Sequence, residues 1–262
     1  MFDVHYHLIF GVDDGPKTIE SSIELAQTSI DEGVTHIVAT PHASDHYPYL
    51  RQVNEERLQM LQEYFGDALT LGLGCDFHLS YENLEEFEKE PTRFTINRSN
   101  YLLVEFPDFV NMVVQSDVLF RIIAAGVTPI ITHPERNPSL IGNSAPLVKW
   151  VHMGCLVQIT AASLWGRFGR AADALCRKLL QANYVHLIAS DAHSLAGRPP
   201  AMRPAFEHLV KTYGLETAER LCIHNPRAMF YGDSLPPQPE PEASLDRKKS
   251  VYGGFLGRLL GK

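Results

Sequence analysis

The chain has 262 residues, of which 45% are hydrophobic and 21% charged, as in an ordinary globular protein of one large or two small domains. The formal net charge of −8 argues against a broad nucleic-acid-binding surface. No apolar run reaches the roughly 18 residues that suggest a membrane span, and no secretory signal is visible. We therefore expect Met1 to be the native start and the protein to be cytoplasmic.

Apolar, strand-like runs alternate with longer amphipathic segments along most of the chain. The predicted strands are 2–7, 36–42, 69–78, 101–106, 128–133, 156–161 and 185–191. Apolar residues at helical spacing predict helices over 18–32, 55–64, 114–125, 145–153, 171–183 and 201–213. Nearly continuous apolar strands are typical of parallel strands buried on both faces. The pattern predicts an α/β fold, either a (β/α) barrel or an open doubly wound sheet.

A domain boundary is predicted near Tyr231. Four of the six residues that begin at Pro236 are prolines, which excludes a helix or a central strand there. We expect 1–231 to form the folded domain and 232–262 to be a Pro-rich linker with a basic-apolar tail. Residues 236–262 carry a net charge of +2, which leaves −10 on the rest. The tail is interpreted either as disordered or as a peptide that docks on a partner or an anionic membrane surface.

The four cysteines are scattered, and no CxxC motif occurs. We expect buried thiols in a reducing compartment rather than a disulfide framework. None begins the Cys-x5-Arg loop of a thiol phosphatase, because Arg227 falls one residue too early after Cys222.

Side chains that can bind metal ions follow six of the seven predicted strands. His5 and His7 end the first strand, and alternate residues of a strand share a face, so both imidazoles can point at one ion. Only the predicted strand 156–161 lacks a clear ligand near its end. The candidate ligands are His5, His7, Asp14, His42, Asp76, Glu105, His133, Asp191 and His193.

In a parallel barrel the strand ends converge on the face that normally carries the active site. Histidine and carboxylate without thiolate suit Zn²⁺, Mn²⁺ or Fe²⁺ rather than a structural zinc cage. Nine candidates exceed what one ion binds, so we expect two or three divalent ions. Arg136 and Arg198 lie just past ligand-bearing strand ends, and phosphate is the natural anion between arginines and cations. A salt bridge to Glu135 or Asp45 is the alternative reading of these arginines.

Taken in order, these motifs resemble the PHP (polymerase and histidinol phosphatase) superfamily. Within it, the chain resembles the bacterial metal-dependent tyrosine phosphatases of capsule and exopolysaccharide operons. The resemblance covers about residues 1–231 and implies a distorted (β/α)7 TIM-like barrel of the PHP type. The segments that carry it are 5–7, 12–16, 39–42, 104–107, 133–137, 189–193 and 197–200.

The resemblance also implies three metal ions, manganese-like, with iron or zinc as alternatives. It implies that one ion is held by His5, His7 and Asp191. A second would be held by Glu105, His133 and a bridging Asp76, and a third by Asp14, His42 and His193. Arg136 and Arg198 would grip the phosphate. Many members carry glutamate where Asp76 stands, and the shorter aspartate could bind one ion only, with His78 or a water filling in.

The implied activity is hydrolysis of phosphotyrosine by attack of a metal-bridging hydroxide. The implied partner is the phosphotyrosine tail of a bacterial tyrosine autokinase, which places the protein at the inner face of the membrane. One alternative is a phosphatase for a small metabolite such as histidinol phosphate. Another is a non-catalytic module that binds phosphotyrosine, while the acidic body disfavours a nuclease.

Overall fold

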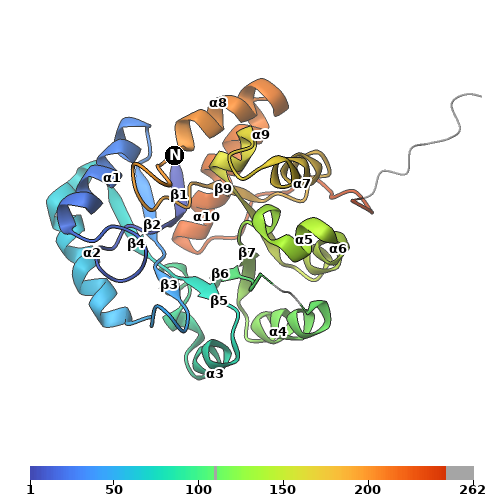
Figure 1. The fold of residues 1–262 in the computed structure, drawn as a ribbon, viewed down its shortest axis with the longest axis horizontal. Coiled ribbons are helices and arrows are strands. Elements are labelled where there is room, and N and C mark those ends of the chain that lie inside the picture. Colours follow the sequence, from blue (N-terminus) through green and yellow to red (C-terminus); the bar gives the residue numbers. More distant parts are fainter. Residues whose placement is uncertain (109–110, 246–262) are drawn as a thin grey trace, which may run out of the picture.

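The computed structural model describes residues 1–108 and 111–245 and shows a ring of strands surrounded by helices (Figure 1). All strand pairs are parallel and form two sheets, with the orders β1-β2-β4 and β3-β5-β6-β7-β8-β9. The predicted parallel α/β barrel is thus confirmed. The strands are β1 (Phe2–Tyr6), β2 (His36–Ala39), β3 (His42–Ala43), β4 (Thr70–Leu73), β5 (Asp76–His78), β6 (Tyr101–Glu105), β7 (Thr128–Ile131), β8 (Leu156–Thr160) and β9 (Leu187–Ala189).

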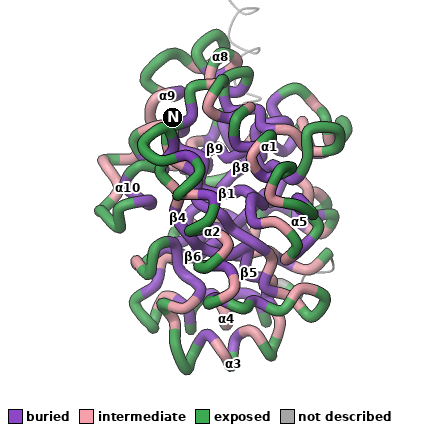
Figure 2. The backbone as a smooth tube through the Cα atoms, turned by 90° about the vertical axis from the view of Figure 1, so that its left-hand side faces the viewer, coloured by how far each residue is buried: buried purple, intermediate pink, exposed green. Residues whose placement is uncertain are grey.

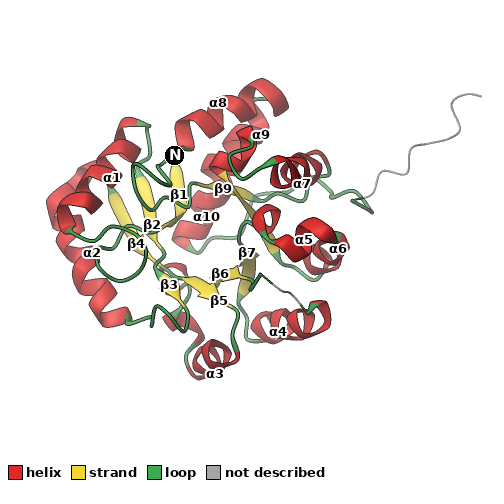
Figure 3. Cartoon of the chain, viewed as in Figure 1, coloured by secondary structure: helices red, strands yellow, loops and turns green. Residues whose placement is uncertain are grey.

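The helices lie mostly around the outside of the ring of strands (Figure 3), although the last of them also contributes side chains to the apolar cluster inside it. They are α1 (Ile19–Asp31), α2 (Arg51–Phe65), α3 (Tyr81–Lys89), α4 (Met112–Ala124), α5 (Pro138–Gly142), α6 (Ala145–His152), α7 (Arg170–Gln181), α8 (Met202–Tyr213), α9 (Leu215–Glu219) and α10 (Asn225–Tyr231). The six predicted helices are present, whereas α3, α5, α9 and α10 were not predicted. Helix α3 gave a weak apolar signal because it buries only Leu84 and Phe87. Its start is fixed by the hydroxyl of Ser80, which accepts a hydrogen bond from the Asn83 N–H.

Two predicted strands, 36–42 and 69–78, are each divided in two, so their continuity was predicted wrongly. The first breaks at Thr40 and Pro41. The Thr40 hydroxyl accepts from the Tyr6 N–H at 2.9 Å, and Pro41 has no N–H for a ladder. Beyond the breaks, β3 pairs with β5 and places His42 directly opposite Asp76.

The ring is closed by contacts between β1 and the chain that follows β9. The His7 N–H donates to the Ala192 carbonyl at 2.9 Å, and the Asp191 N–H donates to the His5 carbonyl at 3.0 Å. The Asp3 carboxylate accepts from the Ser190 N–H at 3.0 Å. These bonds bring the first and last strands together, although they are far apart in sequence.

Buried residues run through the centre of the molecule, and exposed ones lie on its outer turns (Figure 2). A small apolar cluster takes side chains from six strands and from α10, including Val4, Leu103, Leu187 and Phe230, and so fills the inside of the ring. The larger cluster packs the strands against the outer helices.

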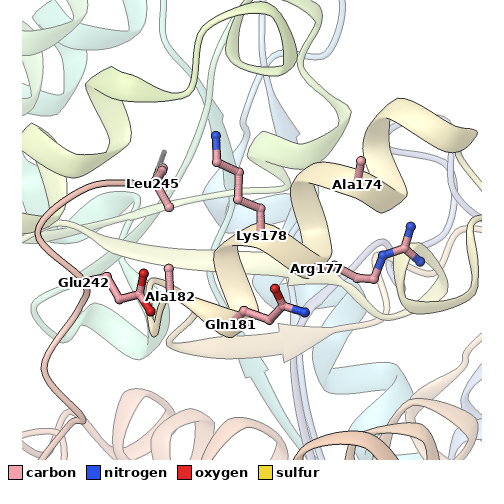
Figure 4. Close-up of a pocket in the computed structure, with 7 residues that line it drawn as sticks. All are labelled: Ala174, Arg177, Lys178, Gln181, Ala182, Glu242 and Leu245. Carbon is pink, nitrogen blue, oxygen red and sulfur yellow. The ribbon is translucent and has the colours of Figure 1, made fainter. Parts of the chain in front are cut away.

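Residues 232–245 run along the body beyond α10. The Glu242 N–H donates to the Ala182 carbonyl at 3.0 Å, and Leu245 is 5% exposed. Between this segment and α7 lies a pocket lined by Lys178 and Gln181, among others (Figure 4). The predicted basic-apolar tail from residue 247 onward lies outside the described residues, and the two-part division stays a prediction. No helix in the described part of the chain is long and apolar enough to cross a membrane.

Candidate metal centre

The nine predicted ligands gather at the C-terminal ends of the strands. They come from the ends of β1, β6 and β7, from β3 and β5, and from the connections after β1 and β9. Three overlapping groups present one ligand atom each within 4.8 Å of one another. These groups are His7-Asp14-His42-His193, His5-His7-Asp76 and His42-Asp76-Glu105. These groups contain seven of the nine predicted ligands, and the other two, His133 and Asp191, lie within 4.0 Å of their members.

His5 and His7 present their Nε2 atoms to Asp191. Each Nε2 lies 3.4 Å from the Asp191 Oδ1 atom. The His5 Nε2 atom is also 3.5 Å from the Asp76 Oδ2 atom. All four side chains are buried. Such spacings match ligands that share one ion, because metal–ligand distances near 2 Å put neighbouring ligand atoms about 3 Å apart.

Asp76 lies between this group and the next one. Its Oδ2 atom is 4.0 Å from the His133 Nε2 atom and 3.6 Å from the His42 Nδ1 atom. Glu105 approaches His133 at 3.7 Å through Oε1, and approaches His42 and His78 at 3.7 Å through Oε2. Aspartate at this position is therefore long enough to face ligands of both groups.

The third group is more open to solvent. The Asp14 Oδ1 atom lies 3.4 Å from the His42 Nε2 atom and 3.3 Å from the His193 Nε2 atom, and Asp14 is 40% exposed. His42 faces this group with one ring nitrogen and Glu105 and Asp76 with the other. The His42 imidazole thus lies between two of the candidate ligand groups.

Two side chains that orient the ligands were missed in the sequence. Asp13 Oδ2 lies 2.7 Å from the His7 Nδ1 atom, and Gln158 Oε1 lies 2.8 Å from the His5 Nδ1 atom. Each contact directs the opposite ring nitrogen, Nε2, into the cluster. Gln158 comes from β8, the strand that supplies no ligand. Its signal was a polar amide in the middle of a mostly apolar strand.

The backbone is strained at two of the ligands. His133 has φ +33° and Asp191 has φ +54°. Residues other than glycine rarely adopt this left-handed backbone conformation. Both residues lie two positions past the end of a strand, β7 and β9 respectively. Three other described residues that are not glycine, Asn97, Arg98 and Asn183, also have positive φ, and none of them is a candidate ligand.

The charge states of Asp191 and His133 favour metal binding, whereas burial at His5 is outweighed by Asp76 and Asp191, which raise the pKa of its imidazole. Burial raises the pKa of the Asp191 carboxyl, but His5, His7 and Arg136 outweigh it and hold that pKa well below its usual range. Burial, reinforced by Arg136, lowers the pKa of His133 to about 4, which keeps that ring neutral. Burial also lowers the pKa of His7, but Asp13 and Asp191 outweigh it and raise the value to about 10. Metal binding at His7 must therefore displace a proton.

The unpaired atoms provide a direct test of whether the residues fit metal ions. The Nε2 atoms of His5, His7 and His193 and the Oδ2 atom of Asp76 are buried without a hydrogen-bond partner. Unpaired buried polar atoms cost about 1–3 kcal/mol each, so four that converge on one place call for a further group. Nitrogen and oxygen donors without thiolate fit divalent cations.

Arg136 and Arg198 both reach the cluster, and both contact Asp191. The Arg136 Nη1 atom donates to Asp191 Oδ2, and the Arg198 Nη1 atom lies 3.3 Å from the same oxygen. Arg198 also pairs with Asp14 Oδ2 at 2.8 Å. The alternative salt bridges to Glu135 or Asp45 do not form in the structure. Glu135 instead accepts hydrogen bonds from Thr160 N–H and the Ser163 hydroxyl.

Comparison with known proteins finds relatives that are named as tyrosine-protein phosphatases. CapC of Staphylococcus aureus is 35% identical over 219 residues, which cover 81% of this chain and 85% of CapC. The tyrosine-protein phosphatase CpsB of Streptococcus pneumoniae is 31% identical over 88% of this chain and 98% of its own length. A solved chain aligns with a TM-score of 0.82 and 28% identity, covering 92% of this chain and 99% of that one. It belongs to crystal structures of Bacillus subtilis YwqE and S. pneumoniae CpsB, described as unique metal-dependent tyrosine phosphatases.

The profile of one protein family matches this chain over residues 1–231. That range contains all nine candidate ligands, both arginines and the whole ring of strands. The chain therefore belongs to the capsular polysaccharide synthesis family CpsB/CapC.

Proposed function

We propose that this chain is a metal-dependent protein-tyrosine phosphatase. The observation that carries the proposal is the convergence of Arg136 and Arg198 on one carboxylate at the edge of the ligand groups. Two guanidinium groups aimed at one small volume provide bidentate donors for the oxygens of a phosphate. The relatives named as tyrosine phosphatases support phosphotyrosine as the substrate class.

We propose two or three divalent ions, manganese first, with iron or zinc as alternatives. His5, His7 and Asp191 would hold one, Glu105 and His133 a second, and Asp14, His42 and His193 a third. Asp76 would serve the first two, which its 3.5 Å and 4.0 Å approaches to His5 and His133 support. When bound, the cations would lower the pKa of a water molecule and neutralise phosphate charge.

The chain's own residues would then bind and orient the ester. Arg136 and Arg198 would donate to the phosphate oxygens and stabilise the charge that they gain in the transition state. Hydrolysis joins a water oxygen to phosphorus and breaks the bond to the phenolic oxygen, which leaves with the bonding electron pair and then takes a proton. A phenol, with a pKa of about 10, leaves more readily than an alcohol, so no strong general acid is required.

The four cysteines are free and buried, so a thiol nucleophile is not part of the proposal. Burial raises the pKa of Cys155 and Cys222 to about 12, which leaves these thiols protonated at neutral pH. Burial also raises the pKa of Cys75 and Cys176.

The test is hydrolysis of a phosphotyrosine peptide with and without chelator. EDTA should abolish phosphate release, Mn²⁺ should restore it, and thiol alkylation should have no effect. Arg136→Ala should lower kcat/KM about 10²- to 10³-fold while the bound metal, measured by elemental analysis, stays unchanged. Activity that survives EDTA but is lost on alkylation would overturn the mechanism. Saturable peptide binding without phosphate release would instead indicate a binding module.

The proposed physiological substrate is the phosphotyrosine tail of a bacterial tyrosine kinase at the inner membrane. The family's link to capsular polysaccharide synthesis supports this assignment. The basic residues from 247 onward would then give weak attraction to anionic lipid. Deletion of residues 244–262 should reduce the fraction that sediments with anionic vesicles. Unchanged sedimentation would remove the membrane role of the tail.

A further inference from the structure

A pocket of about 240 Å³ opens beside Arg198, next to the ligand groups but outside them. Its walls come from the 3-10 turn η5 (Ala161–Trp165) and the loop after it, and from the chain that follows β9. The lining residues on which the argument depends are Trp165, Phe168, Arg198, Pro199 and Pro200. Arg167 and Ser190 also line the pocket, and the rest of its lining residues, apart from Arg198, are apolar or aromatic, in contrast to the charged metal centre.

The wall that carries Arg198 is preorganised. The Arg198 carbonyl accepts from the His193 N–H at 2.8 Å, and the Gly197 N–H donates to the Ser194 hydroxyl at 3.1 Å. Two prolines follow, and each fixes its own φ. A pocket built in this way loses little entropy when a ligand binds.

The opposite wall presents Trp165. The buried Glu135 carboxylate anchors η5 through the Ser163 hydroxyl at 2.6 Å and the Thr160 N–H at 2.9 Å. Trp165 ends that turn and is 46% exposed, although tryptophan is usually well covered in a folded protein. Its exposed ring gives an incoming aromatic group a surface on which to pack.

Both proposed phosphate-binding arginines contact this pocket or a residue that lines it. Arg198 lines the pocket and also contacts the metal-ligand carboxylates Asp14 and Asp191. The Cζ atom of Arg136 lies 4.6 Å from the centre of the Phe168 ring, so this ring covers one face of that guanidinium. A phosphate held by the two arginines therefore has an aromatic-lined pocket directly beside it.

We propose that this pocket binds the aromatic ring of an aryl phosphate, with Trp165 as the principal specificity-determining residue. A phenyl ring has no polar atoms apart from the ester oxygen, so it loses nothing on entering an apolar pocket and can stack on the indole. A polar alcohol, such as an amino alcohol or a sugar, would lose hydrogen bonds to water there. This inference rests on the proposed phosphatase function and names the part of the chain that selects the phenol.

The first test compares leaving groups. For the Mn²⁺-loaded enzyme, Trp165→Ala should lower the ratio of kcat/KM for a phosphotyrosine peptide to that for the matched phosphoserine peptide about tenfold. Trp165→Phe should keep the ratio within about threefold, because it retains a flat apolar ring. The control is Phe120→Ala, which removes an aromatic side chain that is 63% exposed on α4, away from the pocket. An unchanged ratio in Trp165→Ala overturns the inference.

The second test measures binding without turnover. The chain has two tryptophans, and Trp150 is fully buried, so acrylamide quenching of fluorescence reports mainly on Trp165. Phenylphosphonate, which has no ester bond to hydrolyse, should protect this fluorescence from quenching, whereas methylphosphonate should not. Trp165→Phe should show no protection by either compound. Equal protection by both phosphonates would mean that the ring does not enter the pocket.

The outcomes separate this inference from the proposed function. If the wild-type enzyme releases no phosphate from aryl esters in Mn²⁺, the phosphatase function fails. If it does so, but Trp165→Ala keeps the wild-type leaving-group ratio and phenylphosphonate gives no selective protection, only the aryl pocket fails.

Discussion

Asp13 and Gln158 determine how His5 and His7 are presented, although neither is a ligand in the proposed scheme. The Asp13 Oδ2 atom lies 2.7 Å from the Nδ1 atom of His7. The Gln158 Oε1 atom lies 2.8 Å from the Nδ1 atom of His5. Asp13 also accepts from the N–H groups of Gly15 and His42, so it links the loop after β1 to β3. Residue types and spacing predicted the ligands, since they mark each strand end. They could not predict these partners, because a hydrogen bond across the ring leaves no local pattern.

Asp13→Asn should weaken metal binding about 10- to 100-fold while leaving the fold intact. The amide keeps the shape of the carboxylate but loses its charge, and its NH₂ group can favour the tautomer in which the His7 Nε2 atom carries the proton. The measurement is a Mn²⁺ titration of chelator-treated protein, followed by calorimetry. Asp67→Asn, an exposed change far from the site, is the control. Equal affinity in both variants would show that Asp13 does not orient His7.

At the scale of elements, the breaks in the two divided strands could not be predicted from the sequence. The sequence predicted strands at 36–42 and 69–78, and the structure has two strands in or overlapping each of these ranges. The breaks depend on distant partners: Thr40 bonds to Tyr6, and the Tyr49 hydroxyl donates to the Gly74 carbonyl at 3.0 Å. The breaks matter for the site because they set the register in which His42 lies opposite Asp76.

The junction of β8 and β9 depends on a buried neutral histidine. The His186 Nδ1 atom accepts from the Val157 N–H at 3.1 Å, and the His186 N–H donates to the Val157 carbonyl at 2.9 Å. Burial, reinforced by Arg220, lowers the pKa of His186 from 6.5 to about 4. The folded state therefore holds this ring unprotonated at a pH where the unfolded chain protonates it.

His186 should make the protein sensitive to acid. Its folded pKa lies below its unfolded pKa, so its contribution is complete above pH 6.5 and is lost as the pH falls toward 4. The loss should reach about 3 kcal/mol of unfolding free energy across that window. His186→Asn keeps an acceptor for the Val157 N–H and should flatten the dependence. The measurement is urea unfolding at several pH values in EDTA, so that metal release plays no part.

The control for this experiment is His224→Asn, which replaces an exposed histidine near the same junction. It should retain the acid sensitivity of the wild type. If His186→Asn and His224→Asn show the same pH dependence, the buried ring is not its source.

At the scale of the whole molecule, the two strands that close the ring also supply or precede four of the candidate metal ligands. His5 and His7 come from the first strand, whereas Asp191 and His193 follow the last one. Backbone bonds from His7 to Ala192 and from Asp191 to His5 join the two strands at the site. The sequence predicted a barrel and a shared set of ligands, because strand ends converge in any parallel barrel. The resemblance implied that Asp76 bridges two groups, whereas the overlap at His42 could not be predicted, since it depends on how the ring is distorted.

Metal binding should therefore stabilise the entire fold rather than one loop. Only the folded chain brings these ligands together, so Mn²⁺ at a hundredfold excess over its Kd should add about 2.7 kcal/mol, a rise in Tm of roughly 5–10 °C over EDTA-treated protein. Asp76→Asn should lose most of this rise, because its carboxylate faces ligands of two groups. Asp14→Asn should lose less, since Asp14 is 40% exposed and borders only the third group. Equal losses in the two variants would show that Asp76 serves a single ion, and no rise in the wild type would show that closure of the ring does not depend on metal.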